Sequence, residues 1–432
     1  MKILQPGVRV VVAVEAPAHG GYAVARVDGR VLFIRGAIPG ERVEVVIDRV
    51  GRKGRYFYAD VVHVLQASEH RVAHPWPQAA HWGTETRTAA HDVAGGVGGV
   101  ELGHMSLAAS RQWKAQVTQN QLQRLGGLSW GLPDVEAAPG DEGRRGLRWR
   151  TRVQLAVNDA GQAGMRPYRS HEVIPLEDLP IAIESFEDLA VFDQRWPAGS
   201  KLQIALPNAS PGFIAVDGRP WSKSGKKLNV RRAVNERVTA VSDWLPGGAV
   251  TQDFRVSGTG FWQVHRHAPN VLASAVLDAV GDVTGGSVVD LYSGAGLFSA
   301  FLAQSVGESG SVTAIESDEG AVKTARRNMH DAPHVGLIAG DVRDIVKSGE
   351  LSQADVVVLD PPRAGATAPV VRGITESRPR KIVHVSCDVA TFSRDVATYR
   401  EMGWHMESLR VFDIYPLTHH VETLAVFTPM VS

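Results

Sequence analysis

The chain has 432 residues, of which 44% are apolar and 21% are charged, and its 46 basic residues balance its 46 acidic ones. This length exceeds one ordinary hydrophobic core, so we expect a globular protein of two or three domains. The net charge of zero argues against an overall basic nucleic-acid-binding protein but allows local basic patches. The single cysteine excludes an internal disulfide and any multi-cysteine metal site. No apolar run could span a bilayer and the first residues do not resemble a signal peptide, so we expect a cytoplasmic protein without membrane contact.

Residues 1–66 alternate apolar and polar positions, with glycine and proline between the runs, as in VRVVVAV and RVEVVI. This pattern predicts four or five short strands that form a small, all-β, OB-like barrel. Basic residues cluster there beside aromatic ones, at Arg49, Arg52, Lys53, Arg55, Tyr56, Phe57 and Tyr58. Such a group suits RNA phosphates and bases, and it equally fits a solvated, charged barrel surface.

Residues 67–250 are predicted to form a central, mostly β domain. A loop-rich stretch comes first, and a helical pattern follows from Ser106 to Leu125, which we expect to pack on the domain that comes next. Seven arginines accompany one acidic residue, Asp159, between Arg144 and Arg169. A second basic group consists of Lys223, Lys226, Lys227, Arg231 and Arg232. Both groups are candidates for RNA phosphate contacts, although a charged run is also typical of a solvated face.

Residues 251–432 change in character from about Asn270, where helical patterns alternate with apolar strands such as SVVDLYS, ADVVVLD and KIVHVSC. This alternation predicts an α/β domain with a doubly wound, mainly parallel, Rossmann-like sheet. The ligands of such sheets bind at the carboxyl ends of the strands.

The first of these strands runs into a glycine turn at Gly294 and Gly296, which allows close approach of a ligand. Acidic residues then end the next three strands, at Glu316, Asp341 and Asp360. The glycine pair alone also resembles turns that bind NAD. The ordered set of acids fits S-adenosylmethionine better than a dinucleotide, because carboxylates can accept the ribose hydroxyls and meet the adenine amino group.

Cys387 ends the strand of KIVHVSC, and Glu422 follows later in YPLTHHVETLAVF. A lone cysteine at a strand end is by default a small buried hydrophobic residue. A thiol and a carboxylate beside a methyl donor make chemical sense for methylation of carbon 5 of a pyrimidine. A thiolate that adds to carbon 6 makes carbon 5 nucleophilic, and a base must then remove the carbon 5 proton.

The chain resembles the RNA 5-methyluridine methyltransferase family over nearly its full length. Its DPPRAG segment at residues 360–365, its Ser386-Cys387-Asp388 and its His420-Val421-Glu422 match the family's signatures. The opening segment is similar to the TRAM domain, an RNA-binding barrel. The resemblance implies S-adenosylmethionine as cofactor, Cys387 as nucleophile and Glu422 as base. It also implies that Gln263 in FWQVH, Tyr292, Glu316 and Asp360 bind the cofactor.

The chain departs from the family at three positions near the expected site. Asp388 replaces the usual Asn, His384 the usual Tyr, and Leu417 a common Gln or His. A carboxylate at Asp388 would raise the pKa of the thiol unless Arg363 and the following helix start compensate. The segment Val97-Gly98-Gly99-Val100 stands where several members carry cysteines of an iron–sulfur cluster, so we predict no cluster and no other metal site.

We therefore predict an enzyme that uses S-adenosylmethionine to methylate carbon 5 of a uridine in ribosomal or transfer RNA, through a covalent cysteine intermediate. We expect a monomer, and packing or hydrogen-bonding roles for His384, His419 and His420. A cytosine-5 RNA methyltransferase and a non-catalytic RNA-binding protein that kept the fold are the alternatives. The motifs do not determine which RNA or which position is modified.

Overall fold

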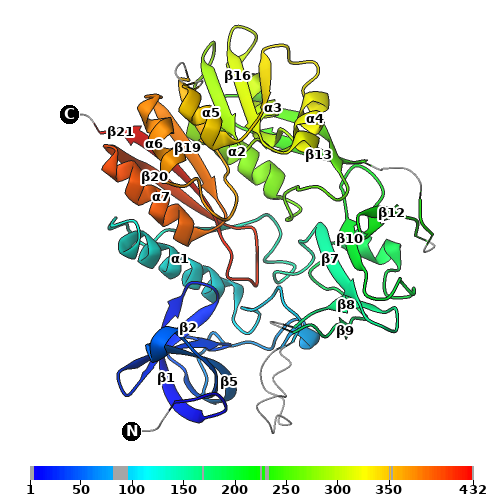
Figure 1. Ribbon diagram of the computed structural model, residues 1–432, viewed down its shortest axis with the longest axis vertical. Coiled ribbons are helices and arrows are strands. Elements are labelled where there is room, and N and C mark those ends of the chain that lie inside the picture. The colour runs from blue at the N-terminus through cyan, green and yellow to red at the C-terminus, as the bar shows by residue number, and fades with distance from the viewer. Residues whose placement is uncertain are drawn as a thin grey trace.

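The structure, a computed structural model, describes residues 4–80, 96–167, 170–223, 226–228, 233–349, 351 and 354–430. The predicted phosphate contacts Arg169, Arg231 and Arg232 lie outside the described residues. Figure 1 shows a barrel at one end, a small sheet to one side, and a large helix-covered sheet at the other end. None of the helices described is both long and apolar enough to cross a membrane.

The N-terminal strands form the predicted closed barrel. Buried and exposed positions alternate along β1 and β4, as a strand with one face on a core requires. A two-residue turn at Asp28 and Gly29, both with positive φ, joins β2 to β3. The barrel order is β1-β2-β3-β5-β4, with β1 (Arg9–Ala18), β2 (Tyr22–Val27), β3 (Arg30–Arg35), β4 (Arg42–Val50) and β5 (Tyr56–Gln66).

Helix α1 (Leu107–Arg124) confirms the helix predicted for this region, and Ser106 caps its first turn by accepting a hydrogen bond from Ala109 N at 3.3 Å. Trp113 and Val117 join the apolar core of the barrel, whereas Leu122 joins a core of the large sheet. Figure 1 shows α1 between the barrel and α7 (Val389–Glu401). The helix therefore connects the barrel to the large domain.

The central domain is mostly β, as predicted. Its inward-facing residues, such as Val153, Leu155 and Ile204, form a core of their own with Phe186 and Trp196. The sheet order is β12-β11-β10-β7-β8-β9, with β7 (Arg152–Val157), β8 (Ala163–Met165), β9 (Ile174–Pro175), β10 (Lys201–Ala205), β11 (Phe213–Val216) and β12 (Arg219–Trp221). Short 3-10 helices are η1 (Arg52–Gly54), η2 (Pro77–Ala79), η3 (Glu184–Leu189) and η4 (Pro246–Gly248).

The hairpin of β13 (Ala233–Val241) and β14 (Ala249–Ser257) crosses the predicted domain boundary at residue 250. Its buried residues Val238 and Phe254 belong to the same apolar core as the helices of the large domain. We therefore propose that the large domain begins before β13.

The large sheet confirms the predicted doubly wound α/β fold. Strands β17, β16, β15, β18 and β19 are parallel, β21 runs antiparallel to β19, and the full order is β17-β16-β15-β18-β19-β21-β20-β6. One face packs on α2 and α3, and the other on α5, α6 and α7. The strands are β6 (Val135–Ala137), β15 (Ser287–Leu291), β16 (Ser311–Glu316), β17 (Val335–Ala339), β18 (Val356–Leu359), β19 (Lys381–Ser386), β20 (Trp404–Asp413) and β21 (Glu422–Pro429). The remaining helices are α2 (Ala268–Val280), α3 (Leu297–Val306), α4 (Glu319–Asn328), α5 (Val342–Ser348) and α6 (Ala368–Glu376).

Candidate active site

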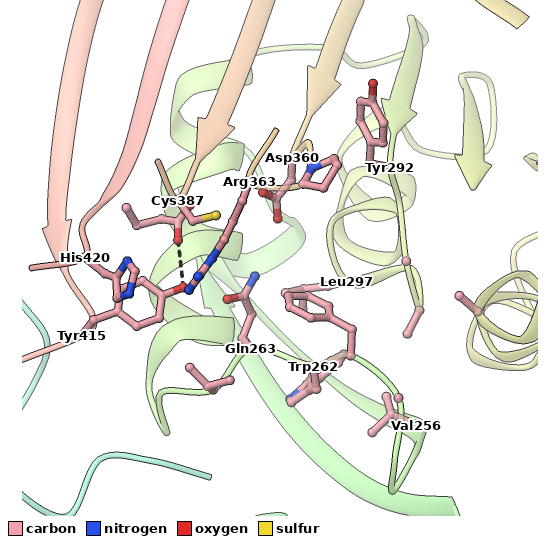
Figure 2. Close-up of a pocket in the computed structure, with 18 of the residues that line it drawn as sticks. Val256, Trp262, Gln263, Tyr292, Leu297, Asp360, Arg363, Cys387, Tyr415 and His420 are labelled. Atoms are coloured by element: carbon pink, nitrogen blue, oxygen red, sulfur yellow. Dashed lines mark hydrogen bonds between the residues drawn. The ribbon is translucent and has the colours of Figure 1, made fainter. Parts of the chain in front are cut away.

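A cavity of about 1490 Å³ opens at the carboxyl ends of the parallel strands. Its wall combines residues of all three domains, for example Tyr22 of the barrel, Arg150 of the central domain and Cys387 of the large domain. In Figure 2, Cys387, Asp360 and Arg363 converge on one space, with Gln263 and Tyr415 beside it. This is the position at which doubly wound sheets bind their ligands.

Strand register brings Cys387 and Glu422 together. In the antiparallel pair of β19 and β21, Ser386 lies opposite Thr423, so the residue after Ser386 and the residue before Thr423 are neighbours at the same edge. Thr423 Oγ1 fixes this register further by donating a hydrogen bond to the Ser386 carbonyl at 3.1 Å. Both Cys387 and Glu422 line the cavity, as the predicted roles require.

The carboxyl group of Glu422 is almost completely buried and accepts a hydrogen bond from a tyrosine. The Tyr415 hydroxyl donates a hydrogen bond to Glu422 Oε2 at 3.1 Å, drawn as the dashed line in Figure 2. Burial and the nearby charge of Asp360 raise the pKa of Glu422 well above its usual value, whereas Tyr415 and Arg363 lower it. A carboxylate with a raised pKa is a stronger base than one in water.

The thiol of Cys387 is not ionised in advance. Burial raises its pKa to about 12, and the charges of Glu422 and Asp360 add to this effect, whereas Arg363 opposes it. A thiol in such surroundings must lose its proton to a neighbouring base as it reacts.

Asp388 has a smaller effect on this thiol than its position next to Cys387 suggested. Its charge follows burial, Glu422 and Asp360 among the causes that raise the pKa of the thiol. Asp388 Oδ1 instead caps helix α7, accepting hydrogen bonds from Ala390 N at 3.0 Å and Thr391 N at 2.8 Å. Burial alone would raise the pKa of Asp388, but the bonds from His19 and Thr391 outweigh it and hold the pKa below the usual range. Asp388 therefore performs the capping role that an Asn could also fill.

Five of the predicted cofactor residues line the cavity: Gln263, Tyr292, Gly294, Glu316 and Asp360. Gly294 has a φ of 55°, and a Cβ built there would meet nothing within 4 Å, so the turn leaves open space for a ligand. Glu316 Oε2 accepts a hydrogen bond from Gly294 N at 3.0 Å, which joins the glycine turn to the acid that ends β16. Burial raises the pKa of Asp360 to about 7.

Two predicted cofactor residues, Gly296 and Asp341, are not among the residues that line this cavity. Gly296 has a φ of 87°, and a Cβ there would lie 2.9 Å from Met329 Cε, so the glycine allows close packing of α3. Asp341 ends the loop after β17 and caps α5, accepting a hydrogen bond from Arg343 N at 2.8 Å. These contacts give each residue a structural role that does not require a ligand.

The histidines near the site have structural partners. His384 is buried among Phe392, Tyr399 and Phe427, and burial lowers its pKa to about 3. Leu417, the third departure from the family pattern, is buried in the core of the central domain. Sequence patterns therefore correctly indicated packing for His384, and they gave no sign of the packing of Leu417.

Glu101, His419 and His420 place possible ligand atoms within 4.8 Å of one another on the cavity wall. Glu101 Oε1 and His419 Nδ1, however, already contact each other directly, and His419 N donates to the same oxygen at 3.1 Å. Val97 and Val100, at the positions of the family's cluster cysteines, are buried in the apolar core of the central domain. The contact between Glu101 and His419 thus joins the linker after the barrel to the loop before β21.

Three residues near the reaction centre were not singled out from the sequence: Tyr415, Glu101 and His19. Tyr415 lies in the same segment as Glu422, but only the turn between β20 and β21 brings its hydroxyl back to the carboxylate. Glu101 and His19 act across domains, which no local pattern can indicate.

A parallel sheet with one antiparallel strand, a glycine turn after its first strand and an acid after its second define an S-adenosylmethionine-dependent methyltransferase. The family model of the methyltransferase small domain matches residues 267–376, and that of tRNA (Uracil-5-)-methyltransferase matches residues 342–428. An uncharacterized RNA methyltransferase of Bifidobacterium longum is 36% identical over 434 residues, covering 96% of each chain. One of Streptomyces avermitilis is 36% identical over 432 residues, covering 95% of this chain and 96% of the relative.

The fold also matches a solved structure, the Pyrococcus abyssi tRNA (uracil-54, C5)-methyltransferase in complex with S-adenosyl-L-homocysteine. The TM-score is 0.64 at 19% identity, with 98% of this chain and 100% of that chain covered. Together these findings show that the chain belongs to the RNA (uracil-5-)-methyltransferase family. It is an enzyme that acts on RNA with S-adenosylmethionine as its cofactor.

Proposed function

We propose that the enzyme methylates carbon 5 of a uridine through a covalent bond between Cys387 and carbon 6 of the base. The observation that carries this proposal is the register of β19 and β21, which sets Cys387 beside the buried Glu422 at the wall of the cavity. A thiol and a carboxylate on neighbouring strand ends can serve both halves of the reaction, the addition to the ring and the later loss of the carbon 5 proton.

The thiol of Cys387 adds to carbon 6, and its proton passes to the neighbouring carboxylate of Asp360, so that Glu422 stays unprotonated for the later step. When bound, S-adenosylmethionine would supply the methyl group that carbon 5 takes up, and the break of its bond between sulfur and methyl would leave S-adenosylhomocysteine. Glu422 removes the carbon 5 proton, the bond between sulfur and carbon 6 breaks, and the thiolate leaves. The raised pKa values of both carboxyl groups support their roles as proton acceptors.

Five residues of this chain would hold the cofactor: Gln263, Tyr292, Gly294, Glu316 and Asp360. The carboxylate of Glu316 suits the ribose hydroxyls, and the open turn at Gly294 suits close approach of the ligand backbone. Asp341 and Gly296 support this wall from behind by capping α5 and by packing α3.

RNA would reach the cavity across the barrel and the central domain, both of which contribute to its wall. The target base must leave its stack, because the reaction needs access to carbons 5 and 6 of the ring. The covalent mechanism needs Cys387 as a free thiol, which a reducing compartment such as the cytoplasm would maintain.

The test compares wild type with Cys387→Ala and Glu422→Gln variants on bulk transfer RNA and ribosomal RNA, followed by nucleoside mass spectrometry. We expect 5-methyluridine from wild type, none from Cys387→Ala, and an RNA–protein adduct resistant to denaturation from Glu422→Gln. Turnover by Cys387→Ala would contradict the covalent mechanism, and 5-methylcytidine would assign the enzyme to cytosine. RNA from a strain that lacks the protein, analysed position by position, would distinguish transfer RNA from ribosomal RNA.

A further inference from the structure

Three arginines alternate in the segment RWRTR, at Arg148, Arg150 and Arg152, and the structure separates them into two kinds. Arg148 forms an ion pair with Glu187 at 2.8 Å, and Arg152 forms one with Glu236 at 3.0 Å. Across the parts of the chain that the structure describes, no carboxylate lies within ion-pair distance of Arg150. Arg150 is also the one of the three that lines the cavity.

The backbone holds Arg150 firmly at this wall. Its N–H donates to the Ile181 carbonyl at 2.8 Å, its carbonyl accepts from Ile183 N at 3.1 Å, and a β-bridge joins it to His265 near Gln263. The guanidinium donates from Nε to the Arg152 carbonyl at 2.8 Å and lies 5.5 Å from the centre of the Trp149 ring. The two terminal nitrogens remain available to a ligand, in the paired geometry that fits a phosphate or a carboxylate.

The carboxylate whose charge acts on Arg150 is that of Glu101, and this carboxylate already contacts His419. Burial lowers its pKa, Tyr415 and Glu101 oppose this effect, and the positive charge of Arg363 adds to it. A partly buried cation beside a second cation is unfavourable unless an anion completes the site. Arg363 lines the same cavity and approaches Cys387 in Figure 2, so such an anion would lie near the reaction centre.

We propose that Arg150 binds a backbone phosphate of the RNA strand beside the target nucleotide and so holds that nucleotide over Cys387. The inference rests on the proposed function, since it assumes that the base enters this cavity. The carboxylate of S-adenosylmethionine is the other anion with suitable chemistry. We favour the phosphate because the neighbours of Arg150 are Glu101 and Tyr415, whereas the residues suited to the cofactor gather around Gly294 and Glu316.

The experiment measures equilibrium RNA binding of Arg150→Gln and Arg150→Lys over a range of salt concentrations. All variants carry Cys387→Ala and no cofactor is added, so no covalent bond contributes and the result does not depend on which base is methylated. The probes are bulk transfer RNA and a uridine-rich single-stranded RNA. Arg237→Gln serves as the matched control, because Arg237 is an exposed arginine paired with Asp253 on the β13–β14 hairpin, away from the cavity.

We expect Arg150→Gln to weaken RNA binding roughly tenfold at low salt and to reduce the slope of log affinity against log salt by about one. Arg150→Lys should keep the slope, and Arg237→Gln should match the parent. S-adenosylmethionine affinity, measured separately, should stay unchanged in every variant. An Arg150→Gln variant that binds RNA like the control overturns the proposal, as does loss of cofactor affinity alone, which would assign Arg150 to the cofactor carboxylate. If Arg150→Gln does not fold, Arg150→Lys alone provides the test. A reduced slope of log affinity against log salt in Arg150→Lys would then overturn the proposal.

Discussion

At the scale of single residues, the site places an unreactive thiol beside two carboxyl groups, and the pKa values of all three groups are raised. Burial raises the pKa of Cys387 to about 12 and also raises those of Glu422 and Asp360, and nearby acidic groups add to the effect at Cys387 and Glu422. Reactivity must therefore come from placing the base and the substrate together, because little thiolate exists at neutral pH.

Replacing Glu422 by Gln should make the thiol more reactive toward a small alkylating agent. Among the nearby charges, that of Glu422 contributes most to the raised pKa of Cys387. Its removal therefore increases the thiolate fraction at a given pH. The rate of iodoacetamide labelling, followed by mass spectrometry at pH 8, measures this directly, since Cys387 is the only cysteine. Asp388→Asn is the control and should increase the rate less, and a larger increase in that variant would contradict our ranking of the two carboxylates.

Replacing Tyr415 by Phe should move the low-pH limb of the activity profile to higher pH. The hydroxyl donates to Glu422 and lowers its pKa, so its loss raises that pKa, and the deprotonated base then forms only at higher pH. The pH dependence of kcat checks this, with Tyr399→Phe as the control, because the Tyr399 hydroxyl lies 3.4 Å from His384 and outside the cavity wall. An unshifted limb with a lower plateau would mean that Tyr415 only supports the fold.

The pairing of Cys387 with Glu422 could be predicted because both residues sit in recognisable family motifs, despite the departures at Asp388 and Leu417. The part of Asp388 could not, since a carboxylate next to a thiol and a carboxylate turned onto its own helix start look identical in a sequence. The position of Asp341 was equally hidden. An acid after a strand serves a ligand or a helix cap, and only the fold decides which.

At the scale of elements, α1 carries a buried charge between domains. Lys114 Nζ lies 2.5 Å from Asp413 Oδ1 at the end of β20 and donates to the Tyr415 carbonyl at 3.0 Å. Both charged side chains are completely buried. This ion pair fixes the start of the loop that carries Tyr415 toward Glu422.

Replacing Lys114 by Met should destabilise the protein by about 3 kcal/mol, because it leaves the carboxylate of Asp413 buried without its closest partner. Arg111 remains 3.8 Å from Asp413 and limits the loss. Urea unfolding measures the change. The double variant Lys114→Met with Asp413→Asn should recover much of the stability, and failure to recover would mean that packing of the lysine stem, rather than the charge, matters.

The larger elements could be predicted because their patterns are local. Alternation over ten residues specifies β1, and the apolar run of β19 specifies a buried strand. Strand β6 has three residues and no readable period, yet it pairs with Val411 to Asp413 at the far end of the chain. Apolar and polar residues alternate in the β13–β14 hairpin as they do in the strands before it. The local sequence therefore does not indicate that its apolar face belongs to the large domain.

At the scale of the whole molecule, the barrel packs directly against residues next to the reaction centre. His19 Nε2 lies 3.4 Å from Asp388 Oδ2, and a Cβ built on Gly21 would lie 3.3 Å from Glu101. Glu101 in turn contacts His419 in the loop before Glu422. The barrel therefore contacts residues next to the nucleophile Cys387 and the loop that precedes Glu422.

Replacing Glu101 by Gln should destabilise the protein at pH 7 and have less effect in acid. Burial raises the pKa of Glu101, but the bonds and charge of His419 outweigh it and lower the pKa to about 2, from a usual value of 4.5. The stabilisation is therefore complete above pH 4.5 and declines as the pH falls toward 2. Urea midpoints of wild type and variant at pH 7, 5 and 3 should converge in acid. A difference that persists unchanged at pH 3 would show that the charge of Glu101 is not its source.

The pairing of β6 with β20 has a consequence for the order in which the protein is made. Strand β6 and helix α1 leave the ribosome early, but their partners β20 and α7 are among the last segments to be synthesised. The nascent chain must therefore carry an open strand edge and the apolar side of α1 until translation is nearly finished, and such surfaces invite aggregation or chaperone binding. The barrel and the central domain, with cores of their own, can fold during that wait. The cavity, which needs all three, can close only at the end.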